Sequence, residues 1–281
     1  MHVTTRLGRL HIETAGSGPP AVLWHSLFVD SATWNRVRAP LAAERRLILI
    51  DGPNHGGSPP VRRPFTLEDC VEAAAEVLDH LDIREPADWL GNAWGGHVGI
   101  RFAAAHQDRC RSLVALGTPV HALTSAERRR IRLLATLYLA AGPGAVVKPL
   151  TDALLGSKAR TEDPEGAAIV AGGFRRAERR GMFDAIRWLS LRRPDLGPVL
   201  GRLETPTLLA TNADDAMWTV AAARSAAGRL RNGGLAILPG SGHVGPLLQA
   251  APDVASLVTA FWRDPEAVIA QHRAQESSPT G

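Results

Sequence analysis

The sequence predicts an α/β protein with a mostly parallel central sheet, helices on both faces and a helical cap inserted into the fold. Three observations favour this class. Segments with strand and helix patterns alternate along both ends of the chain. The middle segment, residues 121–197, has no strand pattern and is helical and rich in arginine. The 281 residues, 45% hydrophobic and 21% charged, are enough to bury a full core.

The first strands are predicted from short apolar runs that end in turns. Residues 9–16 alternate between polar and apolar side chains, as in a strand with one buried face, and a Gly-Ser-Gly-Pro-Pro turn follows. Residues 21–25 and 45–50 are short apolar runs typical of buried strands. Between them, residues 31–44 have a helical pattern, and Ser31 is available to cap that helix.

The next helix has clear boundary signals. Residues 66–82 are amphipathic, Thr66 can cap the first turn, and Asp69 three residues later completes a capping box. A strand is predicted over residues 87–91, and a helix over residues 94–107 follows after a tight turn. This order predicts a strand–turn–helix unit.

The end of the chain repeats the same alternation. Strands are predicted over residues 110–117, 205–212 and 235–240, and helices over residues 219–230 and 251–264. Strands joined through helices run parallel, so the carboxyl ends of these strands should share one edge of the sheet.

The predicted domain organisation follows from this rhythm. Residues 1–120 and 198–263 should form the core, and residues 121–197 a helical cap. The polar residues 264–281 should form a flexible tail. Ligands of open α/β sheets bind at the carboxyl ends of the strands. A cap inserted there would roof the ligand pocket.

The net excess of positive charge lies in the predicted cap. Residues 121–197 carry 14 Lys or Arg against 8 Asp or Glu, a balance of +6, whereas the remainder carries 18 against 20, a balance of −2. No aromatic residues interleave with these arginines, and no nucleic-acid-binding module is visible. We therefore expect a small-molecule substrate rather than a nucleic acid.

Other patterns limit the compartment and the cofactors. Cys70 and Cys110 are isolated, which indicates reduced thiols and a cytoplasmic protein. No leader pattern or apolar run long enough to span a membrane is visible, so no membrane partner is expected. The histidines lack metal-ligand spacing, and the glycines lack a dinucleotide fingerprint. We expect no metal and no cofactor; the sequence is silent on the oligomeric state.

Four polar motifs fall at predicted strand ends. They are His-Ser-Leu at 25–27, Gly-Asn-Ala-Trp-Gly-Gly at 91–96, Asn-Ala-Asp-Asp at 212–215 and Gly-Ser-Gly-His at 240–243. A tight turn, then an acid, then a histidine is the chain order of enzymes with a nucleophile elbow. The spacing between acid and histidine leaves room for one helix and one strand.

With these motifs, the sequence resembles the α/β-hydrolase superfamily over residues 9–120 and 203–262. The resemblance implies that Asp215 orients His243 and that His243 is the general base. It also implies that the backbone N–H groups of Leu27 and Trp94 form an oxyanion hole.

The resemblance leaves some assignments to neighbouring residues. Asp214 competes with Asp215 for the role of the acid, and the spacing in the family favours Asp215. We also expect His25, Ser26 and Trp188 to contact the substrate. The substrate should be small and largely apolar, bound between the sheet and the cap.

The sequence departs from the family pattern at three positions. Ser26 and Asn54 stand where the family has glycine, and Ala93 stands at the nucleophile position. An acyl-enzyme needs an oxygen or sulfur atom there. Three hypotheses remain open. The first is a serine esterase, lactonase or C–C hydrolase whose serine was replaced to trap a substrate. The second is a natural enzyme that uses the His243–Asp215 pair without a covalent step, and the third is an inactive ligand-binding or receptor-like relative.

Overall fold

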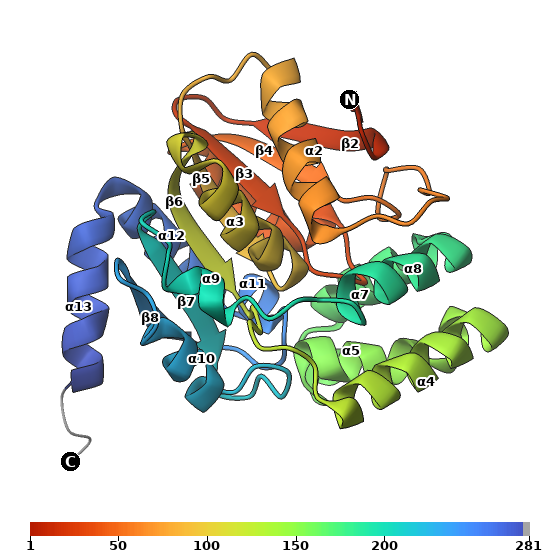
Figure 1. Cartoon of the computed structure of the whole chain (residues 1–281). Helices are drawn as coiled ribbons and strands as arrows, with labels where there is room; N and C mark the ends of the chain where they lie inside the picture. The colour runs from red at the N-terminus through yellow and green to blue at the C-terminus, as the bar shows by residue number, and fades with distance from the viewer. Residues whose placement is uncertain (278–281) are drawn as a thin grey trace.

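The fold is built on one eight-stranded sheet in the order β1-β2-β4-β3-β5-β6-β7-β8 (Figure 1). The structure is a computed structural model and describes residues 1–277. The strands are β1 His2–Thr5, β2 Gly8–Ala15, β3 Pro20–Trp24, β4 Arg46–Asp51, β5 Ala87–Asn92, β6 Cys110–Leu116, β7 Thr207–Asn212 and β8 Gly233–Leu238.

The helices of the core and of the cap alternate with these strands as follows. Those of the core are α1 Asn35–Ala42, α2 Leu67–His80, α3 Trp94–Ala105, α9 Gly197–Leu200, α10 Val220–Ala227, α11 Gly245–Gln249, α12 Ala251–Arg263 and α13 Pro265–Ser277. Those of the segment between β6 and α9 are α4 Ser125–Ala141, α5 Val147–Leu155, α6 Ala159–Glu162, α7 Pro164–Arg176 and α8 Arg179–Ala185. Short turns complete the list: η1 Ser31–Trp34, η2 Gln107–Arg109, η3 Pro143–Ala145 and the π-helical η4 Ile186–Ser190.

The sheet topology confirms the predicted fold class. Strands β3 to β8 run parallel to one another, whereas β2 pairs antiparallel with both β1 and β4. The carboxyl ends of β3, β5, β6, β7 and β8 therefore lie along one edge. This places the loops that carry the four motifs side by side.

Helices cover both faces of the sheet, each over its own apolar layer. Helices α2, α3 and α10 enclose one layer, in which Trp24 and Trp89 are fully buried. Helices α1, α12 and α13 enclose the other, which contains Trp34 and Phe261. Strands sandwiched in this way are apolar on both sides, which explains why their sequences read as continuous apolar runs.

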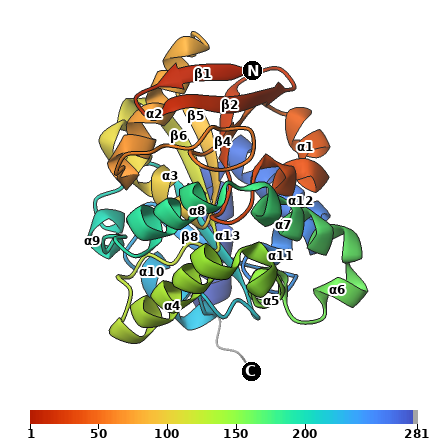
Figure 2. The ribbon, with the colours of Figure 1, turned by 90° about the vertical axis from the view of Figure 1, so that its right-hand side faces the viewer.

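Helices α4 to α8 lie beyond the carboxyl edge of the strands (Figure 1), and Figure 2 looks directly onto them. Helix α4 begins at a capping box in which Thr124 and Glu127 satisfy each other's backbone N–H groups. Tyr138 on α4, Phe174 on α7 and Met182 on α8 form a small apolar cluster of their own.

Two helix starts test the capping predictions. The capping box of Thr66 and Asp69 at α2 is confirmed. The prediction that Ser31 caps the first helix is wrong, because Asp30 accepts the N–H of Ala32 at 3.1 Å and starts a 3₁₀ turn before α1. A carboxylate caps a helix as well as a hydroxyl group does, and here the Asp30 carboxylate is the cap.

The predicted flexible tail is wrong for residues 265–277, which form α13; residues 278–281 lie outside the described residues. Val268 and Ile269 are buried against β8, and the Arg273 guanidinium donates to the carbonyl of Gly233 at 2.8 Å. The sequence of this helix is mostly polar and lacks a helical hydrophobic pattern. Its stability comes from the packing of Val268 and Ile269 on the core.

A buried ion-pair cluster lies at the amino end of β5. The Asp88 carboxylate is fully buried and accepts from Arg45 Nε at 2.8 Å, from Arg111 Nε at 2.9 Å and from Ser112 Oγ at 2.6 Å. Arg45 also donates to the carbonyl of Trp262 at 2.7 Å. The cluster therefore connects β5 and β6 to the end of α12.

Candidate active site

The turn between β5 and α3 has the backbone of a nucleophile elbow. Ala93 has φ 49° and ψ −103°, a left-handed conformation that costs a residue with a side chain about 1–3 kcal/mol. A Cβ on Gly91 would lie 2.3 Å from the backbone of Gly95, and a Cβ on Gly95 would lie 1.8 Å from the carbonyl oxygen of Trp24. Both glycines are therefore required for the close approach of helix and strand.

The predicted acid and histidine lie in direct contact. His243 Nδ1 and Asp215 Oδ2 are 2.9 Å apart, and both side chains are buried. The other Asp215 oxygen accepts the N–H groups of Met217 at 2.8 Å and Trp218 at 3.1 Å. Because a carboxylate only accepts, Nδ1 carries the proton and Nε2 presents a lone pair. Within residues 1–277, no partner of Nε2 is found.

The two aspartates of the acid turn have different partners. Asp214 Oδ2 accepts the Ser241 hydroxyl at 3.0 Å and makes no hydrogen bond to His243 within the described chain. The geometry therefore favours Asp215 as the partner of the histidine, as expected from the spacing.

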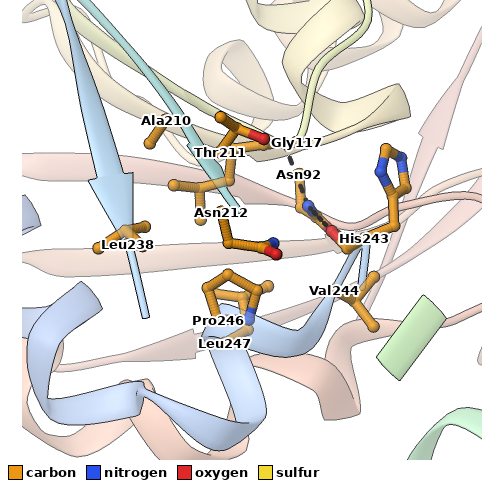
Figure 3. A pocket seen from close by; sticks show the side chains of 11 residues that line it. Asn92, Gly117, Ala210, Thr211, Asn212, Leu238, His243, Val244, Pro246 and Leu247 are labelled. Atoms are coloured by element: carbon orange, nitrogen blue, oxygen red, sulfur yellow. Dashed lines mark hydrogen bonds between the residues drawn. The ribbon is translucent and has the colours of Figure 1, made fainter. Parts of the chain in front are cut away.

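Two asparagines fix this arrangement, and sequence reasoning missed the role of Asn212. Asn92 Nδ2 donates to the carbonyls of Leu116 at 3.1 Å and His243 at 3.3 Å, and Figure 3 shows the Asn92 amide beside the His243 backbone. Asn212 Nδ2 donates to the carbonyl of Gly242 at 2.7 Å, and its oxygen accepts the N–H of Asp214 at 3.0 Å. Each asparagine is the last residue of its strand, β5 or β7. This position beside the predicted site was the signal in the sequence that could have pointed to them.

A small cavity of about 10 Å³ lies behind the histidine, between the ends of β6, β7 and β8 (Figure 3). Asn92 lines this cavity, and the Asn92 side-chain oxygen is buried with no partner in residues 1–277. The Asn92 amide therefore supports the histidine loop from the side of this cavity.

The two backbone N–H groups expected to form the oxyanion hole are available. The N–H of Gly95 donates to the carbonyl of His25 at 3.2 Å, which draws the loop after β3 onto the elbow. In the part of the chain that the structure describes, the N–H groups of Leu27 and Trp94 have no acceptor. Both lie beside the elbow, so they can donate to an oxyanion there.

The structure contradicts the prediction that His25 contacts the substrate. His25 is fully buried, its Nδ1 donates to the carbonyl of Ser26 at 2.7 Å, and its Nε2 accepts the N–H of Gly52 at 2.9 Å. With both ring nitrogens in use, His25 holds two loops together. Burial lowers its pKa, in agreement with a neutral ring.

Ser26 and Trp188 remain predictions as substrate contacts. The Ser26 side chain is buried beside the elbow loop, and its hydroxyl has no hydrogen-bond partner among the described residues. The Trp188 ring is partly buried, with the guanidinium groups of Arg187 and Arg192 stacked at 4.8 and 4.0 Å from its centre.

Asp51 organises the loops around the site. Its carboxylate accepts the N–H groups of Ser31 and Gly57, both at 2.8 Å, and lies 3.0 Å from His11 Nδ1. Burial works to raise the pKa of Asp51, but the nearby His25 and these backbone N–H groups lower it below its ordinary value. Asn54 follows with φ 68°, so an asparagine occupies the left-handed conformation that glycine has in the family pattern.

The cap closes over this site. Only 5% of Ala93 and 6% of His243 is exposed. Arg36 binds Asp163 at 2.8 and 2.9 Å, Arg176 binds Asp30 at 2.6 Å, and Asn54 donates to the carbonyl of Gly181 at 2.9 Å. A groove of about 250 Å³ lies along this seam between the loop at 54–60 and the cap. Little of the surface of Ala93 and His243 is therefore open to solvent.

The buried His55 predicts a loss of stability in acid. Burial, with a smaller contribution from His25, lowers the pKa of His55 to about 3. The unfolded chain binds a proton near pH 6.5, so stability is full above that pH and is lost as the pH falls toward 3, at about 1.4 kcal/mol per pH unit for each such histidine.

We expect His55→Gln to reduce the slope of unfolding free energy against pH by about one proton between pH 6 and 4. Urea titrations at several pH values measure this slope. Burial also lowers the pKa values of His25 and His97, so a residual slope should remain. Identical slopes for the two proteins would show that His55 is not the titrating group.

In residues 1–277, no group of three or more His, Cys, Asp or Glu side chains is placed to hold a metal ion. No helix in that part of the chain is long and apolar enough to cross a membrane.

Comparison with known proteins agrees with this geometry. The family model described as the alpha/beta hydrolase fold matches residues 19–249. The chain is 28% identical over 263 residues to the dihydrolipoyllysine-residue acetyltransferase component of the acetoin cleaving system of Pseudomonas putida. That match covers 88% of this chain but only 64% of the relative, so this chain spans less than two thirds of that protein.

Two further matches cover a larger share of the protein that is compared. The chain is 27% identical over 230 residues to the poly(3-hydroxyalkanoate) depolymerase of Ectopseudomonas oleovorans, covering 79% of this chain and 76% of the relative. The crystal structure of the enol-lactonase from Burkholderia xenovorans LB400 superposes with a TM-score of 0.86 at 21% identity, over 94% of this chain and 100% of the other. At this sequence identity, the similarity to the enol-lactonase shows a shared fold.

Proposed function

The chain belongs to the α/β-hydrolase family, and from this premise we propose that it hydrolyses an ester or lactone of a small, largely apolar substrate. The observation that carries the proposal is the 2.9 Å contact between His243 Nδ1 and Asp215 Oδ2, with Nε2 left unpaired. Burying this polar pair costs free energy. Apart from the contact with His243, Asp215 accepts, among residues 1–277, only N–H groups of its own loop, from Met217 and Trp218. An ordered base beside an elbow is what acyl hydrolysis requires.

The proposed reaction proceeds without an acyl-enzyme, because the Ala93 side chain is a methyl group. His243 Nε2 takes a proton from water as the water oxygen bonds to the carbonyl carbon of the substrate. The resulting oxyanion accepts the N–H groups of Leu27 and Trp94. Collapse of the tetrahedral adduct breaks the bond to the leaving alkoxide, which takes the proton from Nε2, and Asp215 stabilises the transient imidazolium.

A second candidate function is ligand binding without turnover. The observation that favours it is the combination of Ala93 with a site that the cap almost fully covers. A third possibility, that Ala93 replaces a serine of an otherwise ordinary hydrolase, predicts the same binding together with activity of the serine form. The retained His243–Asp215 contact supports the hydrolase proposals, because binding alone does not need an oriented base.

Turnover by the chain with and without His243 tests the proposal. We expect the unchanged protein to cleave activated aryl esters or lactones above the buffer rate, and His243→Ala to lose at least about 10²-fold of that rate, the usual contribution of a general base. His106→Ala is the control, because His106 lies on the core surface against Glu72.

The control should retain full activity. Equal rates for the unchanged protein and His243→Ala, in folded proteins, would refute general-base catalysis. Saturable binding of an ester analogue with no product formed would favour the ligand-binding alternative.

A further inference from the structure

The outer side of helix α4 is an apolar stripe that no part of residues 1–277 covers. Leu133 is 69% exposed, Leu137 43% and Leu134 39%. Residues four apart lie on one face of a helix, so Leu133 and Leu137 line up, and the exposed Ala140 and Ala141 continue the stripe. The opposite side, with Ala135 and Tyr138, packs into the cap. Isolated exposed leucines are ordinary, but a stripe of them is not.

Arginines border this stripe. Residues 128–141 contain four arginines and no acidic residue, and Arg129, Arg130 and Arg132 are exposed. Arg128 donates to the carbonyl of Leu191, which brings the segment after η4 against the first half of α4. The exposed Arg187 and Arg192, stacked on the Trp188 ring, belong to this neighbouring segment. The outer face of α4 thus presents exposed leucines with exposed arginines beside them.

We propose that the outer face of α4 docks onto an anionic lipid surface. Leucines that project from one convex helix can sink into a deformable acyl layer, whereas a protein partner would need a matching groove. Arginines beside the leucines meet anionic headgroups. The helix lies in the interface and does not cross the bilayer, which agrees with the short apolar stripe.

Docking through α4 would act on the same helical segment that packs over the site. The same segment carries α7 and α8, which bind loops of the core through the Arg176–Asp30 pair and the hydrogen bond from Asn54 to the carbonyl of Gly181. A lipid surface that holds α4 would act on the element that closes the site. Docking itself does not depend on the proposed hydrolysis, because it is measured without substrate.

Vesicle sedimentation with the full chain tests the proposal. We expect partitioning onto phosphatidylglycerol vesicles to exceed that onto phosphatidylcholine vesicles by about tenfold or more and to weaken as salt is added. Leu133→Ser with Leu137→Ser should lower partitioning onto the anionic vesicles by about tenfold. Arg129→Gln with Arg130→Gln should remove most of the preference for the anionic lipid.

Matched controls come from elsewhere on the surface. Ile237→Ser removes an exposed apolar side chain from β8, and Arg84→Gln removes an exposed arginine from the core. Both should bind vesicles like the unchanged protein. Equal binding by every variant, or no binding to phosphatidylglycerol, overturns the proposal. Sedimentation velocity showing a dimer that the double leucine variant abolishes also overturns it, because the stripe would then be covered by a second copy.

Discussion

Replacing Ala93 by serine is expected to raise the turnover of activated esters by at least about 10³-fold. Loss of a triad serine lowers kcat by around 10⁶ in a serine protease, and the elbow at φ 49° already holds the backbone in the nucleophile conformation. The new hydroxyl would lie beside an oriented His243. Stopped-flow measurement should show a burst of released alcohol equal to the enzyme concentration, the mark of an acyl-enzyme.

Ala93→Gly is the matched control for this gain. It lacks the hydroxyl group but relieves the left-handed strain, so it should stay at the rate of the unchanged protein and gain about 0.5–1 kcal/mol of stability. If a folded Ala93→Ser protein shows neither a burst nor a faster rate on any ester or lactone tested, the elbow is not aligned with His243, and the hydrolase assignment loses its geometric basis.

Asp88→Ala is expected to lower the free energy of unfolding by about 3–5 kcal/mol. The change leaves the Arg45 guanidinium, which is itself almost fully buried, without its carboxylate partner. The cost of an unpaired buried charge dominates, because the other hydrogen bonds of Arg45, to the carbonyls of Glu44 and Trp262, do not neutralise it. Urea unfolding, followed by tryptophan fluorescence, measures the change.

Glu13→Ala is the control for Asp88. Glu13 pairs with Arg38 on the surface, where both side chains are about a third exposed. Removal of such a pair costs at most about 1 kcal/mol. Similar losses for the two variants would mean that the buried cluster is hydrated or replaceable and is not a structural anchor.

The sequence was sufficient to predict the sheet and to place Asp215 beside His243. Strands covered on both faces must be apolar throughout, so β3 to β8 stood out as runs between polar turns. Once these strands are parallel, Asp215 at the end of β7 and His243 after β8 must be neighbours, because the register pairs Asn212 with Leu238. The apolar runs and the order of the motifs along the chain are therefore enough to locate the strands and the residues at their ends.

Side-chain assignments near the site were less predictable. His25 follows a strand exactly as a substrate-binding residue would, but its ring faces inward, toward the backbone N–H of Gly52 across the sheet edge. Asn92 and Asn212 resemble ordinary turn residues, and their contacts reach carbonyls 151 and 30 residues away. Only the three-dimensional arrangement reveals such long-range partners.

Helix α13 has a practical consequence for anyone shortening this chain. Its composition invites removal, since it resembles a dispensable polar extension. Without it, the apolar side chains beneath Val268 and Ile269 at the outermost strand β8 would meet solvent, and the carbonyl of Gly233 would lose its arginine donor. A preparation truncated after Arg263 would then be prone to aggregate through that bare strand.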